Sequence, residues 1–88
     1  MTADEIRQVV LRILGAIAPE ADLVALDPQA NLRETLDLDS MDFLNFVIGL
    51  HRETGVDVPE ADYAKLSTLA GSIDYLAGRG SAAQGGTR

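Results

Sequence analysis

The residues best suited to chemistry lie in one acidic stretch, Leu36-Asp37-Leu38-Asp39-Ser40-Met41-Asp42-Phe43-Leu44. Asp39 and Asp42 have the spacing of a helix N-cap and its reciprocal partner, which predicts a helix over 40–54. Ser40 would lie in the first turn of this helix with its hydroxyl pointing outward. The positive end of the helix dipole and the unsatisfied N–H groups there favour negative charge, so the position suits a phosphate-linked group. A plain helix-capping serine is the alternative interpretation.

Composition limits the classes of protein to consider. The chain has 88 residues, of which 47% are hydrophobic, enough for one small domain with a single core. It has no cysteine, which excludes disulfides, thiolate metal sites and a cysteine nucleophile. The net charge of −7 disfavours nucleic acid and anionic membranes and favours partners with basic patches, although acidity could also serve only solubility. We expect a cytoplasmic monomer that does not insert into membranes.

A metal site is the other chemistry that the acidic stretch suggests. Asp37, Asp39 and Asp42 could be ligands for calcium. However, an EF-hand loop needs glycine at its sixth position and a glutamate at its end, and the stretch has neither. We therefore predict no metal site.

Hydrophobic spacing and capping signals predict an all-α fold. A capping box at Thr2 and Glu5 begins a helix over 3–17, and the helix over 40–54 follows a connection of about 21 residues. The leucines in this long loop predict that it packs in an ordered way on the core. In the second helix, Gly49 indicates either a close approach of the backbone to another element or simple tolerance, and we favour tolerance.

The second half of the chain predicts two further helices. Residues 60–64 form one short helix, and Ser67 can cap a last helix over 68–77. Residues 79–88 contain no large apolar side chain and are expected to be a flexible tail. The prediction is therefore a domain over 1–78, built as a small bundle of three main helices and one short helix, with a long loop between helices 1 and 2.

Several segments together resemble the acyl carrier protein family, including its peptidyl carrier relatives. They are the Asp-Ser stretch, Val56-Asp57-Val58-Pro59, Leu66-Ser67-Thr68-Leu69 and Ser72-Ile73-Asp74-Tyr75-Leu76. The resemblance implies that a phosphopantetheinyl transferase attaches 4′-phosphopantetheine from coenzyme A to Ser40. The thiol of that arm would hold an acyl group as a thioester, so the protein would be a carrier and not an enzyme. A helical interaction module with Ser40 as a plain cap is the rival from another class.

The resemblance also implies an acyl pocket between the second and third helices. Its matching positions are Leu32, Val47, Leu50, Val58, Tyr63, Leu66 and Ser72. Tyr63 and Ser72 are bulkier or more polar than a purely aliphatic cavity would need, which disfavours long saturated chains or favours an acyl group with a polar substituent. Core packing without ligand contact is the alternative role for each.

Partner recognition is expected near the serine and along the second helix. The residues assigned to it are Asp37, Asp39, Met41, Asp42, Phe43, Asn45 and Arg52. The family usually has glycine where Asp37 stands, in a left-handed turn that aspartate tolerates. Asn45 and Arg52 replace carboxylates that are common in fatty-acid carriers, and Phe43 could contact a partner or pack on Val58 or Tyr63. These departures favour a carrier in a specialised lipid or secondary-metabolite pathway. The alternatives are a housekeeping carrier of fatty-acid synthesis and an aminoacyl or peptidyl carrier.

Overall fold

The first long helix and the helix that starts at Ser40 begin and end where the sequence predicts. In the computed structural model, α1 spans Ala3–Ile17 and α3 spans Ser40–Thr54. Each starts with a complete capping box, formed by Thr2 with Glu5 and by Asp39 with Asp42. Because both caps satisfy otherwise free backbone N–H groups, they fix the start of each helix.

The connection between α1 and α3 is ordered and contains a helix that the sequence analysis did not predict. This helix, α2, spans Leu32–Thr35, and the side chain of Asn31 caps it by accepting a hydrogen bond from the Glu34 amide (3.0 Å). Asp37 follows it with a positive φ of 56°, which confirms the left-handed turn. The Leu38 amide then donates to the Arg33 carbonyl (2.9 Å), a bond typical of a Schellman helix end. This turn leads the chain directly into the cap of α3.

The second half of the chain folds into a 3-10 helix and a long α-helix. η1 spans Glu60–Leu66, and α4 spans Leu69–Gly85. The structure describes the backbone of residues 1–85 and the side-chain surroundings of residues 1–79. α4 therefore continues past the predicted end at residue 77 and includes part of the segment expected to be a flexible tail, although three glycines between 78 and 85 disfavour a helix. The tail expected over 86–88 lies outside the described residues.

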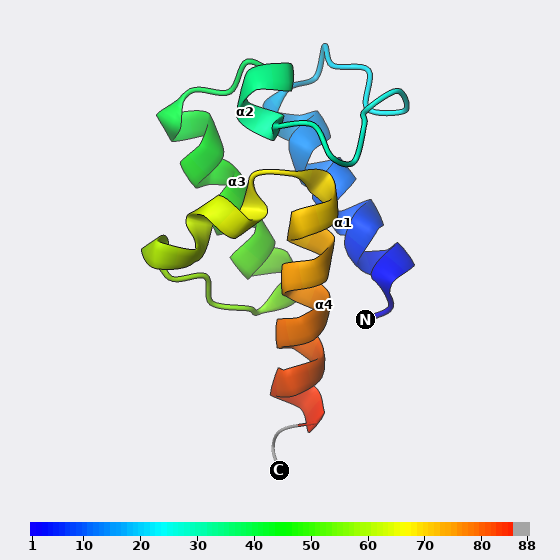
Figure 1. The fold of residues 1–88 in the computed structure, drawn as a ribbon, viewed down its shortest axis with the longest axis vertical. Helices are drawn as coiled ribbons and strands as arrows, with labels where there is room; N and C mark the ends of the chain where they lie inside the picture. Colours follow the sequence, from blue (N-terminus) through cyan, green and yellow to red (C-terminus); the bar gives the residue numbers. More distant parts are fainter. Residues whose placement is uncertain (86–88) are drawn as a thin grey trace.

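All the described secondary structure is helical, which confirms the predicted fold class. α1 packs against both α3 and α4, and η1 packs against α4. Figure 1 shows α2 and the long connection at the end of the molecule away from the two termini. The core is formed by apolar side chains from every helix and from the long connection. Its fully buried members include Val10, Leu14, Leu32, Phe46, Leu50, Leu66 and Leu69.

Gly49 lies where α3 approaches α1 closely. A Cβ atom added to Gly49 would lie 3.0 Å from Cγ2 of Ile13, closer than ordinary van der Waals contact. The interpretation of Gly49 as merely tolerated was therefore wrong, because the close approach of the two helices favours a residue without a side chain.

Candidate functional site

Ser40 is the first residue of α3 and is exposed. The N-cap role belongs to Asp39, whose Oδ1 accepts a hydrogen bond from the Asp42 amide (2.8 Å), while the Asp39 amide donates to Asp42 Oδ2 (3.2 Å). The Ser40 hydroxyl is thus not the acceptor that caps the helix. It projects from the positive end of a 15-residue helix and is available for modification.

Arg33 is a residue of this site that the sequence analysis missed. Its Nη2 atom donates to Ser40 Oγ at 3.5 Å, and its guanidinium carbon lies 5.8 Å from the centre of the Phe43 ring. α2 brings Arg33 to this position from seven residues before the serine. The signal that could have found α2 is the Asn31-Leu32-Arg33-Glu34 spacing, which resembles the helix starts at Thr2 and Asp39.

Phe43 is largely buried and packs against other aromatic side chains of the site. It is 9% exposed, and its ring lies 6.2 Å from Tyr63 in an edge-on arrangement and 5.9 Å from Phe46. The structure shows the packing against Tyr63 that was the alternative role of Phe43, and its assignment to partner recognition stays a prediction. The apolar side chains of α3 that do face solvent are Met41, Leu44 and Ile48, which are 62%, 38% and 43% exposed. Met41 was in the predicted recognition set, whereas Leu44 and Ile48 were missed.

The other residues assigned to recognition are accessible to different degrees. Asp37, Asp39, Asn45 and Arg52 are exposed, and Asp42 is half-buried. Asn45 lies near the serine end of α3, whereas Arg52 lies in its last turn. The predicted set thus runs along most of the helix instead of forming one compact cluster.

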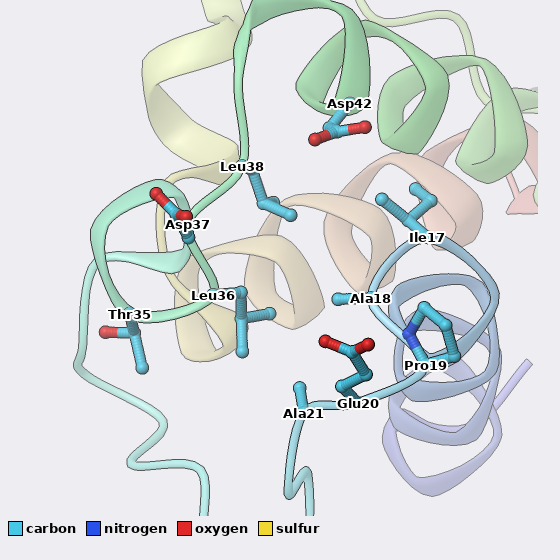
Figure 2. Close-up of a pocket in the computed structure, with 10 residues that line it drawn as sticks. All are labelled: Ile17, Ala18, Pro19, Glu20, Ala21, Thr35, Leu36, Asp37, Leu38 and Asp42. Carbon is cyan, nitrogen blue, oxygen red and sulfur yellow. The ribbon is translucent and has the colours of Figure 1, made fainter.

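An acidic groove lies beside the start of α3. Its volume is about 470 Å³, and it is formed by the end of α1, the turn after α2 and the first turn of α3. Figure 2 shows the carboxylates of Glu20, Asp37 and Asp42 around this groove, with Ile17, Ala18 and Leu36 among the apolar side chains. The groove therefore combines negative charge at its rim with apolar surface.

Most of the residues predicted for the acyl pocket belong to the packed core. Leu32, Leu50, Leu66 and Ser72 are fully buried and Val47 is nearly so, whereas Val58 and Tyr63 are half-buried. The Ser72 hydroxyl donates to the Leu66 carbonyl (3.2 Å). Since this bond satisfies the buried hydroxyl, Ser72 needs no polar ligand to explain its position.

Tyr63 also lines two shallow surface grooves that begin near Ser40. One groove has a volume of about 350 Å³ and is lined by Arg33, Ser40, Phe43, Leu44, Glu60 and Tyr63. The other, of about 270 Å³, has the lining Arg33, Phe43, Tyr63, Ala64 and Ser67. Both grooves lie between α2, α3 and η1 and share the Arg33, Phe43 and Tyr63 side chains in their linings, whereas Ser40 lines only the first.

Asp62 lies on η1 and forms a charged network with residues of η1 and α4. It accepts a hydrogen bond from the Tyr75 hydroxyl (2.7 Å) and forms ion pairs with Arg79 (3.3 Å) and Lys65 (3.6 Å). The hydrogen bond from Tyr75, followed by the two cations, lowers the pKa of Asp62. Burial and this same hydrogen bond raise the pKa of Tyr75. The network joins η1 to α4 and so holds the Tyr63 side of the grooves in place.

Two further features concern metals and membranes. Among the residues that the structure describes, no group of three acidic or histidine side chains is arranged to hold a metal ion. Within that same part of the chain, none of the helices has the length and apolar character needed to cross a bilayer.

Comparisons with known proteins identify the family. The family model for the phosphopantetheine attachment site matches residues 4–76. An acyl carrier protein of Rubrobacter xylanophilus is 28% identical over 75 residues, which are 80% of this chain and 90% of that protein. A solved structure of the acyl carrier protein from Enterococcus faecalis superposes with a TM-score of 0.78 and 26% identity, covering 90% of this chain and 99% of the other. The chain therefore belongs to the phosphopantetheine attachment site family, whose members are carriers and not enzymes.

Proposed function

We propose that Ser40 carries 4′-phosphopantetheine and that the protein transports acyl groups as thioesters on that arm. The observation that carries the proposal is the exposed Ser40 hydroxyl in the first turn of α3, where Asp39 does the capping. The residues present fit the group, because the helix N-terminus and Arg33 both favour a phosphate at this oxygen. The bound arm supplies the thiol that this cysteine-free chain lacks. The chain's own contribution is to present the arm and to be recognised by partner enzymes.

Mass spectrometry tests the attachment. The purified protein is incubated with coenzyme A and a broad-specificity phosphopantetheinyl transferase, then digested with trypsin. Cleavage after Arg33 and Arg52 releases a peptide whose single serine is Ser40, so the modification is located directly. We expect one phosphopantetheine on this peptide and none on a Ser40→Ala variant, with a Ser67→Ala variant modified like the wild type. No gain of mass on the wild-type peptide would refute the proposal.

The acidic groove and the start of α3 support recognition by basic partner surfaces. Asp37 and Asp42 line the groove together with Glu20, and Asp39 lies between them in sequence. We propose that Arg or Lys side chains of the transferase and of acyl-handling enzymes meet these carboxylates, and that exposed Met41 contributes apolar contact. Such an encounter would be faster at low salt, because salt screens interactions between exposed charges. The protein would act as a cytoplasmic monomer.

Asn45 and Arg52 support a specialised pathway over housekeeping fatty-acid synthesis. Both are exposed on α3, where Asn45 offers no charge and Arg52 would repel a basic partner. Each such rim contact is worth on the order of 1 kcal/mol and acts mainly on the association rate. We expect general fatty-acid synthesis enzymes to load or elongate the holo protein poorly.

A double variant tests this specialisation. Asn45→Glu with Arg52→Glu should improve loading by those enzymes, and the improvement should grow as salt is lowered. An Arg7→Glu, Gln8→Glu double variant is the matched control, because it also makes the chain three charges more negative but does so on α1 instead of α3. Efficient use of the wild-type protein by general enzymes would contradict specialisation and indicate a housekeeping carrier.

The acyl chain is proposed to enter the core between α3 and η1. Half-buried Val58 and Tyr63 pack against the buried core that includes Leu50 and Leu66. A chain entering here would have to displace core contacts, because these residues pack against one another. Solution NMR tests this: loading an acyl chain should shift the Leu50 and Leu66 methyl signals relative to the holo protein. Unchanged core signals would contradict entry.

A further inference from the structure

The guanidinium of Arg33 lies close to the Ser40 hydroxyl and also contacts the face of an aromatic ring. Its Nη2 lies 3.5 Å from Ser40 Oγ, and its guanidinium lies over Phe43, which itself contacts Tyr63 edge-on. Within residues 1–79, the ion pairs formed by arginine and lysine side chains involve Arg12, Lys65 and Arg79. In that part of the chain, Arg33 thus contacts a neutral hydroxyl and forms no ion pair with a carboxylate.

This arrangement suits an anion built on the serine better than it suits the serine alone. A contact of 3.5 Å to a hydroxyl is at the long limit for a hydrogen bond and contributes little. A guanidinium, in contrast, is planar and has several N–H donors that match phosphate oxygens in pairs. Stacking on Phe43 orients this fork before any anion is present, which lowers the entropy cost of pairing.

The carboxylates around Ser40 oppose an anion at this position, so a nearby cation would stabilise it. Asp39 and Asp42 of α3, Asp37 of the preceding turn, Glu34 of α2 and Glu60 of η1 all lie on the elements that surround the serine or line its groove. Each of these carboxylates repels a phosphate. Arg33 is the cation that reaches the serine oxygen within the described side chains, so it offsets this repulsion together with the α3 dipole.

We propose that Arg33 is a positioning residue that pairs with the phosphodiester on Ser40 and directs the prosthetic arm toward the groove of Phe43 and Tyr63. This inference rests on the proposed attachment at Ser40. The arm would begin in the 350 Å³ groove that Arg33 and Ser40 share. A specific anchor at the root of the arm restricts the directions in which the thiol end can be presented.

A phosphate placed on Ser40 without any transferase gives the first test. Phosphoserine is incorporated at position 40 during synthesis, and its titration is followed by phosphorus NMR. Because a nearby cation favours the dianion, Arg33→Gln should raise the titration midpoint by about 0.2–0.7 pH units. Arg33→Lys should fall between the wild type and Arg33→Gln, because it keeps the charge but loses the planar fork. Arg7→Gln is the control for loss of one positive charge from α1, away from Ser40.

Two outcomes of this titration would overturn the inference. One is an equal midpoint for the wild type and Arg33→Gln. The other is an equal rise for Arg7→Gln and Arg33→Gln, which would indicate a general effect of net charge. Circular dichroism of each variant shows whether the helical fold is intact, and exposed Arg33 can be replaced without opening the core.

The second test uses the holo protein and separates this inference from the proposed function. The melting temperature is measured for apo and holo forms, with the modification verified by mass spectrometry. The melting temperature of the holo form minus that of the apo form should be about 1–6 °C higher in the wild type than in Arg33→Gln. Equal differences would overturn the role of Arg33 while leaving attachment intact. No modification of wild-type Ser40 would refute the proposed function, and the phosphoserine titration would still decide whether Arg33 binds an anion there.

Discussion

Asp37 controls the turn that delivers Ser40 to the start of α3, and its substitution gives a quantitative prediction. Its φ of 56° lies in the left-handed region, which costs most L-residues about 1–2 kcal/mol and costs aspartate and asparagine less. The turn also carries the bond from the Leu38 amide to the Arg33 carbonyl (2.9 Å) that closes α2. The residue at position 37 therefore affects both the stability of the fold and the placement of Arg33.

Three uncharged substitutions isolate the backbone effect from the loss of charge. Asp37→Ala should be less stable than Asp37→Asn by about 1 kcal/mol, because alanine has no polar side chain to relieve the left-handed conformation. In a domain of this size that difference lowers the melting temperature by about 4–8 °C. Asp37→Gly should be at least as stable as Asp37→Asn, since glycine adopts the turn freely, although its greater freedom when unfolded offsets part of the gain by about 0.4–1 kcal/mol.

Thermal unfolding ranks the three variants, and hydrogen exchange locates the effect. The Leu38 amide should exchange faster in Asp37→Ala than in Asp37→Asn, because the turn that holds its hydrogen bond opens more often. Amides in the middle of α1 serve as the internal reference for global unfolding. Equal melting temperatures for the alanine and asparagine variants would refute the argument that the left-handed turn limits the choice of residue.

Three further predictions concern acid, helix packing and salt. Asp62→Asn should lower the melting temperature at neutral pH. Tyr75 and the neighbouring cations lower the pKa of Asp62, so the stability that Asp62 contributes is present above its ordinary pKa and is lost as the pH falls through the lowered pKa. The difference in melting temperature between wild type and variant should therefore close below about pH 4. A constant difference down to pH 2 would contradict this. Gly49→Ala should destabilise the wild type by about 1 kcal/mol in denaturant unfolding, because its Cβ would crowd Ile13, and should stabilise an Ile13→Ala background, where helix propensity dominates. Stabilisation in both backgrounds would exclude crowding. Sodium chloride should raise the melting temperature by screening the net charge of −7, and a flat or falling trend in calorimetry would count against self-repulsion.

The sequence predicts the helices that have strong local signals. The bounds of α1 and α3 follow from their capping boxes, and the end of α3 follows from Gly55, which adopts a left-handed conformation with φ 74°. These signals act within four residues of each helix end, so they can be recognised without the tertiary structure. Ser40 could be placed in the first turn of α3 for the same reason, but its choice as the attachment site over a plain capping serine rested on the resemblance of several segments to the acyl carrier protein family.

The features that were missed depend on contacts between distant segments or on very short elements. α2 has four residues, too few to show a helical period, and only its Asn31 cap marks it. The end of α4 was misplaced because composition alone does not determine whether a segment without large apolar residues continues a helix. Burial of Phe43 depends on the position of η1, which brings Tyr63 against it from 20 residues away, and no periodicity within α3 could specify that contact.

The role of Phe43 illustrates how the site combines local and distant information. From the sequence, an aromatic residue three positions after the serine suggests a contact for partners, because it lies near the expected cofactor. In the structure, Tyr63 covers one edge of the ring, and Arg33 lies over its face. The ring thus acts indirectly: it orients the guanidinium that reaches Ser40, and it leaves Met41, Leu44 and Ile48 as the apolar surface of α3. Under the proposals made above, the arm would follow the groove of Phe43 and Tyr63, and partners would contact Met41 and Ile48. Leu44 is exposed and also lines that groove, so only substitutions of Met41 or Ile48 test recognition by partners without changing the lining of the groove.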